Sequence, residues 1–437
     1  MAALKFLFTL LVLVAALVAW IALPWQGALV LLLLLAAWLG LTRSGVQARS
    51  VAGIGLRTLP QRLGSSAVIV MGIAGVVGVL VALLAMAEGY GHTVRQSGSE
   101  DSAIVLRGGS AAEVQSVLTR DSLTQIAQAQ GIARSAKGEP LVSEEIVVAA
   151  NLPIKGRTQD DGSVQMRGIG EMAYQVRPHV RIVQGRHFQP GLTELVVGQG
   201  AARQFAGLTL GSTLRMGNRE WTVVGVFASG DAMESEVWAD AEIVASTYRR
   251  GSSRNSVTLK LERPESFSTF KQALAANPQL KVDASTTLDF YAKQSERMTQ
   301  MLRIIGITVG SIMAVGAVFG ALNTMFAAVA SRAREIATLR AIGFGGTPVV
   351  TAVLIETMLL ALLGGAIGGA LSYVLFNGFE ASTLSAGSVG KLSFELRVSA
   401  DLLWQGLKWA LAIGMIGGLF PALRAATLPV STALREA

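Results

Sequence analysis

The chain has 437 residues, of which 51% are hydrophobic and 15% charged, and its formal net charge is +8. Soluble domains carry about 25% charged residues, so this composition, with a mean hydropathy of +0.50, excludes an ordinary soluble enzyme and a disordered chain. The sequence has no cysteine and only three scattered histidines, which gives no thiolate or histidine-rich metal site and no thiol nucleophile. The basic excess flanks apolar segments, whereas 89–298 is nearly neutral. This pattern is typical of membrane topology signals, and we expect no nucleic-acid partner.

Two apolar runs open the chain, Leu4–Leu23 and Ala28–Leu41, with only four residues between them. A bilayer crossing needs about 20 apolar residues, so the second run would span only marginally. The alternative for the first run is a cleaved signal peptide. We favour a retained helical hairpin, because no small-x-small cleavage site precedes Pro24 and the second run follows at once.

Four further apolar runs are long enough to cross a membrane: Ser65–Ala87, Leu302–Ala330, Val349–Phe376 and Leu403–Leu423. The loops 42–64 and 331–347 are rich in arginine, which predicts that both are cytoplasmic. Six spans with both termini inside satisfy these signals, and they leave 89–298 outside the membrane.

The outer segment 89–298 predicts a folded α/β domain. Apolar spacing indicates a helix over Ala112–Gln130, and shorter helices are expected at Gln199–Ala206, Asp240–Tyr248 and Glu265–Ala275. Strand-like runs cover Glu145–Ala149, Val164–Ile169, Glu194–Val197 and Glu220–Phe227, with a hairpin turn at Met216–Arg219. The amphipathic stretch Leu288–Arg303 runs without a helix breaker into the next span.

The most informative stretch is Asn323–Gly346, which reads NTMFAAVASRAREIATLRAIGFGG. It predicts a short cytoplasmic helix that carries both charged and apolar side chains: Arg332, Arg334, Glu335, Ile336, Leu339 and Arg340, with Gly343 at its end. A topology signal alone would explain the arginines but not the apolar residues beside them. Spacing leaves both readings open, a topology signal and a docking helix for a cytoplasmic partner.

These residues resemble the coupling region of FtsX-like and MacB-type ABC transporter permeases. Similar matches occur around Glu356, in the terminal GGLFPALRAA at 417–426, and in GRHFQPGLTELVVGQGAARQF within the outer segment. The resemblance implies an α-helical membrane protein of about six transmembrane helices, made of an N-terminal hairpin and a four-helix FtsX-like core. It also implies a large α/β periplasmic domain of MacB type and a location in the bacterial inner membrane.

The expected organisation follows the chain. It comprises an N-terminal transmembrane hairpin (1–42), a cytoplasmic basic segment (43–64), a first core helix (65–88), a periplasmic α/β domain (89–298), a second core helix (299–330), a cytoplasmic coupling helix (331–347), a third core helix (348–376), a short periplasmic loop (377–402), a fourth core helix (403–423) and a cytoplasmic tail (424–437).

Two further groups are candidate sites within the spans. Glu356 lies about 10 Å inside the third core helix, where an ionisable residue is a functional candidate and an interhelical hydrogen bond is the alternative. Glycines at helical spacing, above all Gly316, Gly320, Gly364 and Gly368, predict close helix packing, either between two permeases or within one.

The resemblance implies a non-catalytic membrane subunit with no cofactor, metal or catalytic residue of its own. The sequence lacks the G-x-x-x-x-G-K-[ST] loop that cradles nucleotide phosphates, so ATP and Mg²⁺ are expected on a separate ABC ATPase. A second permease copy or paralogue, a periplasmic adaptor, an outer-membrane channel and membrane lipids are the other implied partners. The expected function is ATP-driven export; the alternatives are lipoprotein release of the Lol type and FtsX-like signalling to cell-wall hydrolases.

Overall fold

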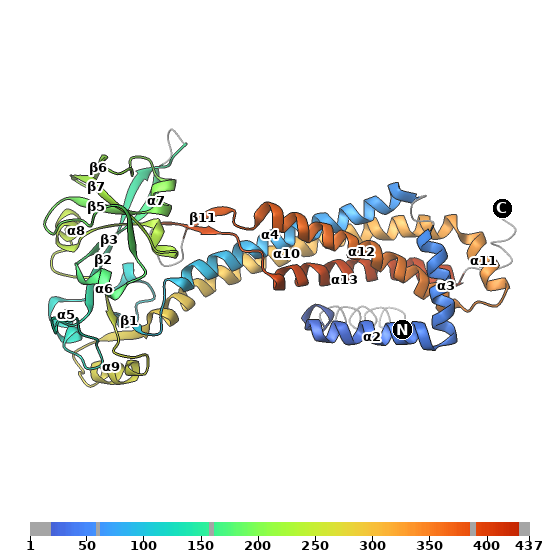
Figure 1. Cartoon of the computed structure of the whole chain (residues 1–437), viewed down its shortest axis with the longest axis horizontal. Helices are drawn as coiled ribbons and strands as arrows, with labels where there is room; N and C mark the ends of the chain where they lie inside the picture. The colour runs from blue at the N-terminus through green and yellow to red at the C-terminus, as the bar shows by residue number, and fades with distance from the viewer. Residues whose placement is uncertain (1–18, 58–61, 157–160, 385–389, 428–437) are drawn as a thin grey trace, which may run out of the picture. The chain divides into compact units, whose positions relative to one another are not determined.

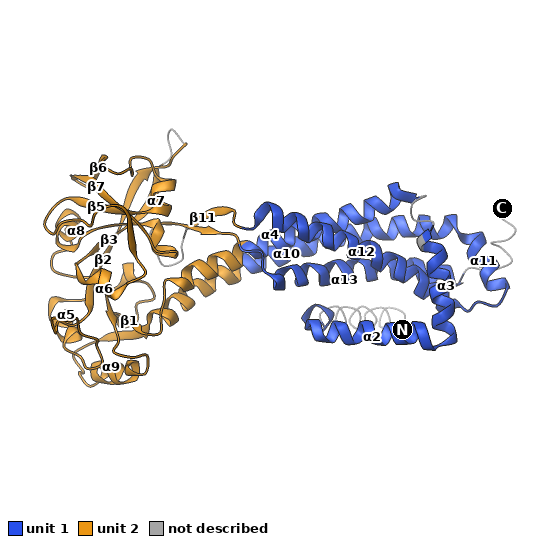
Figure 2. Ribbon diagram, in the orientation of Figure 1, with its two compact units in different colours: residues 1–85, 302–377, 397–437 blue, residues 86–301, 378–396 orange. Residues whose placement is uncertain are grey.

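The computed structural model describes residues 19–57, 62–156, 161–384 and 390–427. The chain divides into two compact units (Figures 1 and 2). Unit 1 comprises 1–85, 302–377 and 397–437, and unit 2 comprises 86–301 and 378–396. Most of the first expected span, Leu4–Leu23, lies outside the described residues.

Unit 1 is helical. Among the described residues, four helices are long and apolar enough to cross a membrane, namely α4 (Leu63–Gln96), α10 (Thr287–Ser331), α12 (Gly346–Phe376) and α13 (Ala400–Thr427). A bent pair, α2 (Trp25–Leu41) and α3 (Arg43–Arg57), would make a fifth span if it is counted as one. The four core helices agree with the four long apolar runs of the sequence.

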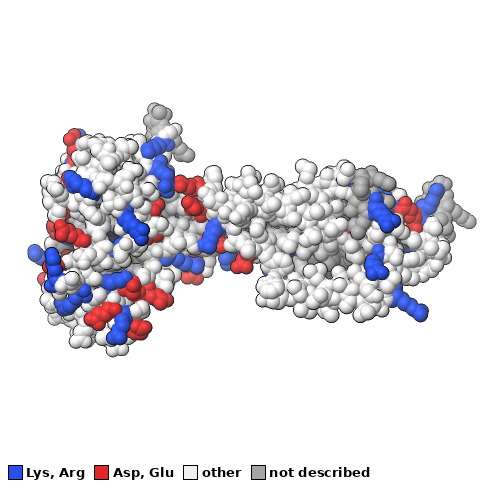
Figure 3. Space-filling model, in the orientation of Figure 1, with Lys and Arg blue, Asp and Glu red and all other residues white. Residues whose placement is uncertain are grey.

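The core helices approach one another closely because small residues line their contacts. Helices α12 and α13 pack along each other. A Cβ added at Gly418 of α13 would lie 2.2 Å from the Thr357 hydroxyl, and one at Gly414 would lie 2.5 Å from the Ala361 side chain. Charged side chains are nearly absent from the visible face of these helices, and they reappear at the end that holds α3 and α11 (Ala333–Ala341) (Figure 3).

Unit 2 is an α/β domain built on a ten-stranded, mostly antiparallel sheet of order β10-β1-β9-β2-β3-β8-β5-β7-β4, with β6 paired to β7. Its strands are β1 (Ser102–Arg107), β2 (Val142–Pro153), β3 (Asp161–Ile169), β4 (Arg181–Gly185), β5 (Glu194–Gly198), β6 (Thr213–Met216), β7 (Arg219–Ala228), β8 (Glu236–Asp240), β9 (Ser256–Lys260) and β10 (Val282–Thr286). The helices are α5 (Arg120–Ala127), α6 (Met172–Val176), α7 (Gln199–Gln204), α8 (Ala241–Thr247) and α9 (Ser266–Ala275), with short 3-10 turns η2 (Glu113–Gln115) and η3 (Ala232–Ser235). A separate two-stranded ribbon pairs β11 (Glu380–Leu384) with β12 (Lys391–Glu395).

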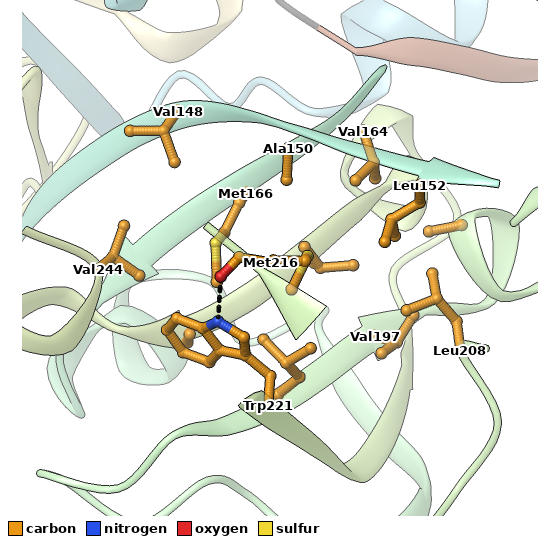
Figure 4. Close-up of a cluster of buried hydrophobic side chains, with 14 of the residues drawn as sticks. Val148, Ala150, Leu152, Val164, Met166, Val197, Leu208, Met216, Trp221 and Val244 are labelled. Atoms are coloured by element: carbon orange, nitrogen blue, oxygen red, sulfur yellow. Dashed lines mark hydrogen bonds between the residues drawn. The ribbon is translucent and has the colours of Figure 1, made fainter. Parts of the chain in front are cut away.

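Two hydrophobic cores hold unit 2 together. The larger core lies under β2, β3, β5, β7 and β8, where Trp221 is fully buried and its Nε1 donates to the Met216 carbonyl over 3.1 Å (Figure 4). The smaller core joins β1 and β9 to α5 and α9, around Phe270 and Ile126. The expected hairpin turn is confirmed, since Met216 pairs with Arg219.

The four expected strands are also confirmed, but the single long helix over 112–130 is wrong. The segment forms η2 and the separate helix α5 instead. Between them the backbone of Leu118 pairs with that of Arg254, and the Thr119 side chain caps α5 by accepting from the Ser122 amide. Tertiary backbone pairing therefore overrides the local helical spacing.

Candidate functional site

The Asn323–Gly346 motif contains, as expected, a short helix, α11, directly after α10. Ile336 and Ala337 are buried on one side of it, whereas Arg334 and Glu335 are exposed. The sequence motif predicted an apolar surface beside the charges, and the burial of Ile336 corrects this in part. Leu339 and Arg340 are half-buried, while Ile342 just beyond the helix is 70% exposed.

The end of α11 is fixed by Gly343. This residue has φ +103°, a conformation that side chains with a Cβ rarely adopt. Its N–H donates to the Arg340 carbonyl, and the Phe344 N–H donates to the Leu339 carbonyl over 3.1 Å. This pair of bonds is a Schellman motif, which satisfies the last carbonyls of the helix and turns the chain sharply toward α12.

The structure joins two residues that the sequence treated separately. Arg332, expected on the coupling surface, lies at the junction of α10 and α11, and Glu356 projects from α12. The Arg332 Nη1 donates to Glu356 Oε2 over 2.8 Å and Nη2 to Oε1 over 3.2 Å, which is a bidentate pair. The side chains are only 12% and 7% exposed. Glu356 is therefore an ion-pair partner of the motif.

A third element meets this pair. The Arg332 Nη2 also donates to the Gly55 carbonyl of α3 over 3.3 Å. Next to the pair lies a cavity of about 40 Å³, lined by residues of α3, α10, α11 and α12.

A second arginine lies near the same junction. Arg62, just before α4, donates to the Ala328 carbonyl of α10. Burial, and then the positive charge of Arg332, lower the pKa of Arg62.

The glycine candidates divide into two kinds. A Cβ at Gly364 would lie 2.8 Å from the Val70 carbonyl oxygen, and one at Gly368 would lie 2.4 Å from that of Ala74, so both pack against α4 within the subunit. Gly316 and Gly320 are exposed, and a Cβ at either position would meet nothing within 4 Å in the part of the chain that the structure describes. Of the two alternatives for the glycines, packing within one chain accounts for the α12 pair but not for the α10 pair.

A buried ionic cluster in unit 2 was missed by the sequence analysis. Arg167 on β3 bonds to Glu113 of η2 over 2.8 Å, to Glu145 of β2 over 2.7 Å and to Glu236 of β8 over 2.7 Å. Arg177 completes the cluster with a 2.5 Å bond to Glu145. The five side chains are at most 9% exposed. Glu113 accepts from the Ser256 hydroxyl over 2.7 Å and Arg177 donates to the Thr258 hydroxyl over 3.1 Å, so the cluster links β9 of the smaller core to β2, β3 and β8 of the larger one.

Opposite charges offset the cost of burial at Glu145 and Arg167. Burial alone would raise the pKa of the Glu145 carboxyl, but the guanidinium groups of Arg177 and Arg167 outweigh it and lower that pKa. Burial would likewise lower the pKa of Arg167, and Glu113 and Glu236 raise it instead. The only sequence signal was charged residues inside strand-like runs, Glu145 and Arg167, where a solvated face is the ordinary explanation.

Within the described residues, no group of three or more His, Asp or Glu side chains is placed to hold a metal ion. The His179 Nε2 lies 3.1 Å from Asp231 Oδ2.

Comparison with known proteins gives two family matches. Residues 66–277 match the MacB-like periplasmic core domain, and residues 307–430 match the FtsX-like permease C-terminal domain. Among curated relatives, the macrolide export ATP-binding/permease protein MacB 1 of Aeromonas hydrophila is 26% identical over 63% of this chain and 44% of its own length. MacB of Bordetella avium is 27% identical over 68% of this chain and 46% of its own length. The chain thus spans less than half the length of these relatives.

Among solved structures, the periplasmic region of MacB from Actinobacillus actinomycetemcomitans matches 46% of this chain and 92% of its own chain, at 15% identity and a TM-score of 0.33. The two family matches follow each other in the order of the resemblance noted in the sequence, and the second contains α11 and Glu356. The chain therefore belongs to the FtsX/MacB-type ABC transporter permeases and is a multi-pass protein of the inner membrane.

Proposed function

We propose that this permease couples a separate ABC ATPase to conformational change in its periplasmic domain, and that the complex exports a substrate with a periplasmic adaptor and an outer-membrane channel. The MacB-like domain and the export proteins among the relatives support this function. In this proposal the ATPase binds Mg²⁺ and hydrolyses ATP, and the permease itself is not catalytic.

The observation that carries the proposal is the construction of α11. Its inner side is packed and its Arg332 is clamped to α12, while Arg334, Glu335 and Ile342 face outward. Side chains held on a short, well-fixed helix suit recognition, because little conformational entropy is lost when a partner binds. We therefore assign the outer side of α11 as the docking surface for the ATPase.

The motion has a direct route along the chain. Arg332 follows the last residue of α10, a helix of 45 residues that begins at Thr287 in unit 2 and ends at Ser331 in unit 1. In the proposed mechanism, closure of the ATPase displaces α11, and α10 carries that displacement to the periplasmic domain. Substrate then need not pass between the spans.

The exposed face of α10 supports a second permease copy as partner. Gly316 and Gly320 lie open on it beside Ile312 and Phe319, which are 68% and 67% exposed. Small residues between large apolar ones allow close helix association in a bilayer. Lipids would cover this face in a lone subunit.

Charge reversal on α11 tests the docking surface. Glu335→Arg should abolish co-purification of the ATPase, because an unpaired charge in a docked interface costs about 2–5 kcal/mol, or about 30- to several-thousand-fold in affinity. Arg49→Glu, an exposed reversal on α3, is the control and should retain the ATPase. If Glu335→Arg still co-purifies with the ATPase and the ATPase rate is unchanged, the docking site does not include Glu335 and lies elsewhere.

A further inference from the structure

The segment before the first core helix forms a bent strap, which we define as residues 20–57 and call the N-terminal strap. Its two helices, α2 and α3, meet at an angle of 96°. The elbow is a built feature: the Thr42 hydroxyl donates to the Trp38 carbonyl over 2.8 Å and accepts from the Gly45 N–H over 2.9 Å. A Cβ at Gly45 would lie 2.0 Å from the Trp38 carbonyl oxygen, so the elbow needs glycine there.

One end of the strap is tied to α13. The Trp20 indole N–H donates to the Lys408 carbonyl over 2.9 Å. The Lys408 ammonium donates in return to the carbonyls of Ile21 and Leu23, just before α2 begins. Lys408 is only 7% exposed, so in an apolar span these carbonyls solvate a charge that would otherwise be costly.

The other end of the strap contacts the ion pair between Arg332 and Glu356 at the start of the docking helix α11. Small residues, Gly45, Ala48, Ala52 and Gly55, are buried along one side of α3, and α3 packs against α12. At Gly55 the backbone carbonyl accepts from Arg332, and an added Cβ would lie 3.1 Å from both Arg332 Nη1 and Glu356 Oε2. The absence of a side chain at Gly55 is what lets three elements meet at one guanidinium.

We propose that the N-terminal strap is a positioning element for the docking helix α11. Through Gly55 it holds Arg332 in the bidentate geometry with Glu356, and through Lys408 it links that clamp to α13. The strap thus sets the angle at which α11 leaves α10, and displacement of α11 must also move α3. This inference rests on the proposed function only in taking the ATPase as the partner that docks on α11. The contacts between the strap and Arg332, Glu356 and Lys408 lie within this chain.

A glycine pair on α3 provides a matched test. Gly55 and Gly53 lie on the same helix, but among the described residues a Cβ at Gly53 meets nothing within 4 Å. Either substitution removes a helical glycine, so any gain in helix propensity is shared. We compare Gly55→Leu with Gly53→Leu, and Gly55→Ala with Gly53→Ala as the milder pair in case the larger side chain prevents folding.

The expected result separates positioning from docking. In the complex with the ATPase, Gly55→Leu should lower the kcat for ATP by about two- to thirtyfold, the range in which a residue away from both sites changes coupling. The KM for ATP and the amount of co-purified ATPase should stay unchanged, and Gly53→Leu should match the wild type. Equal kcat values for the Gly55 and Gly53 variants, in both pairs, would overturn the inference.

A measurement on the permease alone keeps the inference independent of the proposed function. The chain has no cysteine, so Ala52→Cys and Val353→Cys, which replace residues lining the same cavity between α3 and α12, can report their contact by disulfide formation. The disulfide should form in the wild-type background and the Gly53→Leu background but fall severalfold with Gly55→Leu. If the ATPase does not bind but this pattern holds, the docking proposal fails and the strap contact stands. Equal cross-linking in all three backgrounds would refute the inference that Gly55 positions α3 against the Arg332–Glu356 pair.

Discussion

Two buried arginine sites in this permease use the same chemistry in different surroundings. In the periplasmic domain, Arg167 is 1% exposed and bonds to three glutamates from three elements of the fold. In the membrane unit, Arg332 is 12% exposed, has Glu356 as its carboxylate partner, and lies beside a cavity of about 40 Å³. A network that joins two arginines to three glutamates fixes its elements together, whereas the Arg332–Glu356 ion pair, with free volume beside it, can re-form after its elements shift. We interpret the first site as a lock between two cores and the second as a movable clamp.

Removing Arg167 should have the largest effect. Arg167→Met leaves three glutamates buried without their shared cation, and breaking a buried ion pair from one side costs about 3–5 kcal/mol. The periplasmic domain should therefore become sensitive to limited proteolysis at temperatures where the wild type resists. Arg263→Met replaces an exposed arginine and should leave the digestion pattern unchanged. A stable Arg167→Met domain would refute the lock.

Weakening the membrane clamp should cost less. Glu356→Gln keeps the shape of the side chain but removes the charge-assisted bonds to Arg332, which are worth about 1.5–3 kcal/mol. The unfolding temperature of the permease in detergent should fall while the protein still inserts and folds. Arg332→Lys should also lower the unfolding temperature, since an ammonium cannot make the bidentate contact. An effect as large as that of Arg167→Met would erase the contrast between the two sites.

Glycines of α12 and α10 extend the comparison to helix packing, because Gly368 of α12 packs against α4 whereas Gly320 of α10 is exposed. Gly368→Leu places a side chain against the Ala74 carbonyl of α4, and overpacking of this kind costs about 1–3 kcal/mol. A Cβ at Gly320 meets nothing within 4 Å among the described residues, so Gly320→Leu should not lower the unfolding temperature. Size-exclusion chromatography of Gly320→Leu reports separately on the second permease copy. Equal destabilisation by both variants would contradict the assignment of Gly320 to an open face.

The smallest expected effect is the acid response of the lock. The arginines lower the folded-state pKa of Glu145 below its unfolded value of about 4.3. Its contribution to stability is therefore fully present at neutral pH and is lost only as the pH falls below about 4.3 through the lower folded value. Unfolding of the periplasmic domain followed against pH should be flat in the neutral range and steepen in acid. A decline that begins near neutral pH would require another titrating group.

Features of the fold that depend on local sequence pattern could be predicted from the sequence. Four long apolar helices and the short helix α11 could be predicted because apolar length and helical spacing are carried by neighbouring residues. The pairing of Arg332 with Glu356 could not, because helical spacing indicates depth but not which side chains of two helices meet. Gly55 gave no signal, since its role depends on what lies opposite. The helix expected over 112–130 failed for a similar reason, because Leu118 pairs with the distant Arg254.

Cross-linking from a single introduced cysteine tests the central claim, that α11 docks the ATPase, most directly. The chain has no native cysteine, and Ile342 beside α11 is 70% exposed. In membranes that contain the complex, Ile342→Cys should form a covalent adduct with the ATPase when a short thiol-to-amine cross-linker is added. Ile312→Cys, on a residue of α10 that is 68% exposed, should form none. An Ile342→Cys permease that still supports ATP hydrolysis by the complex but never cross-links to the ATPase would contradict the account.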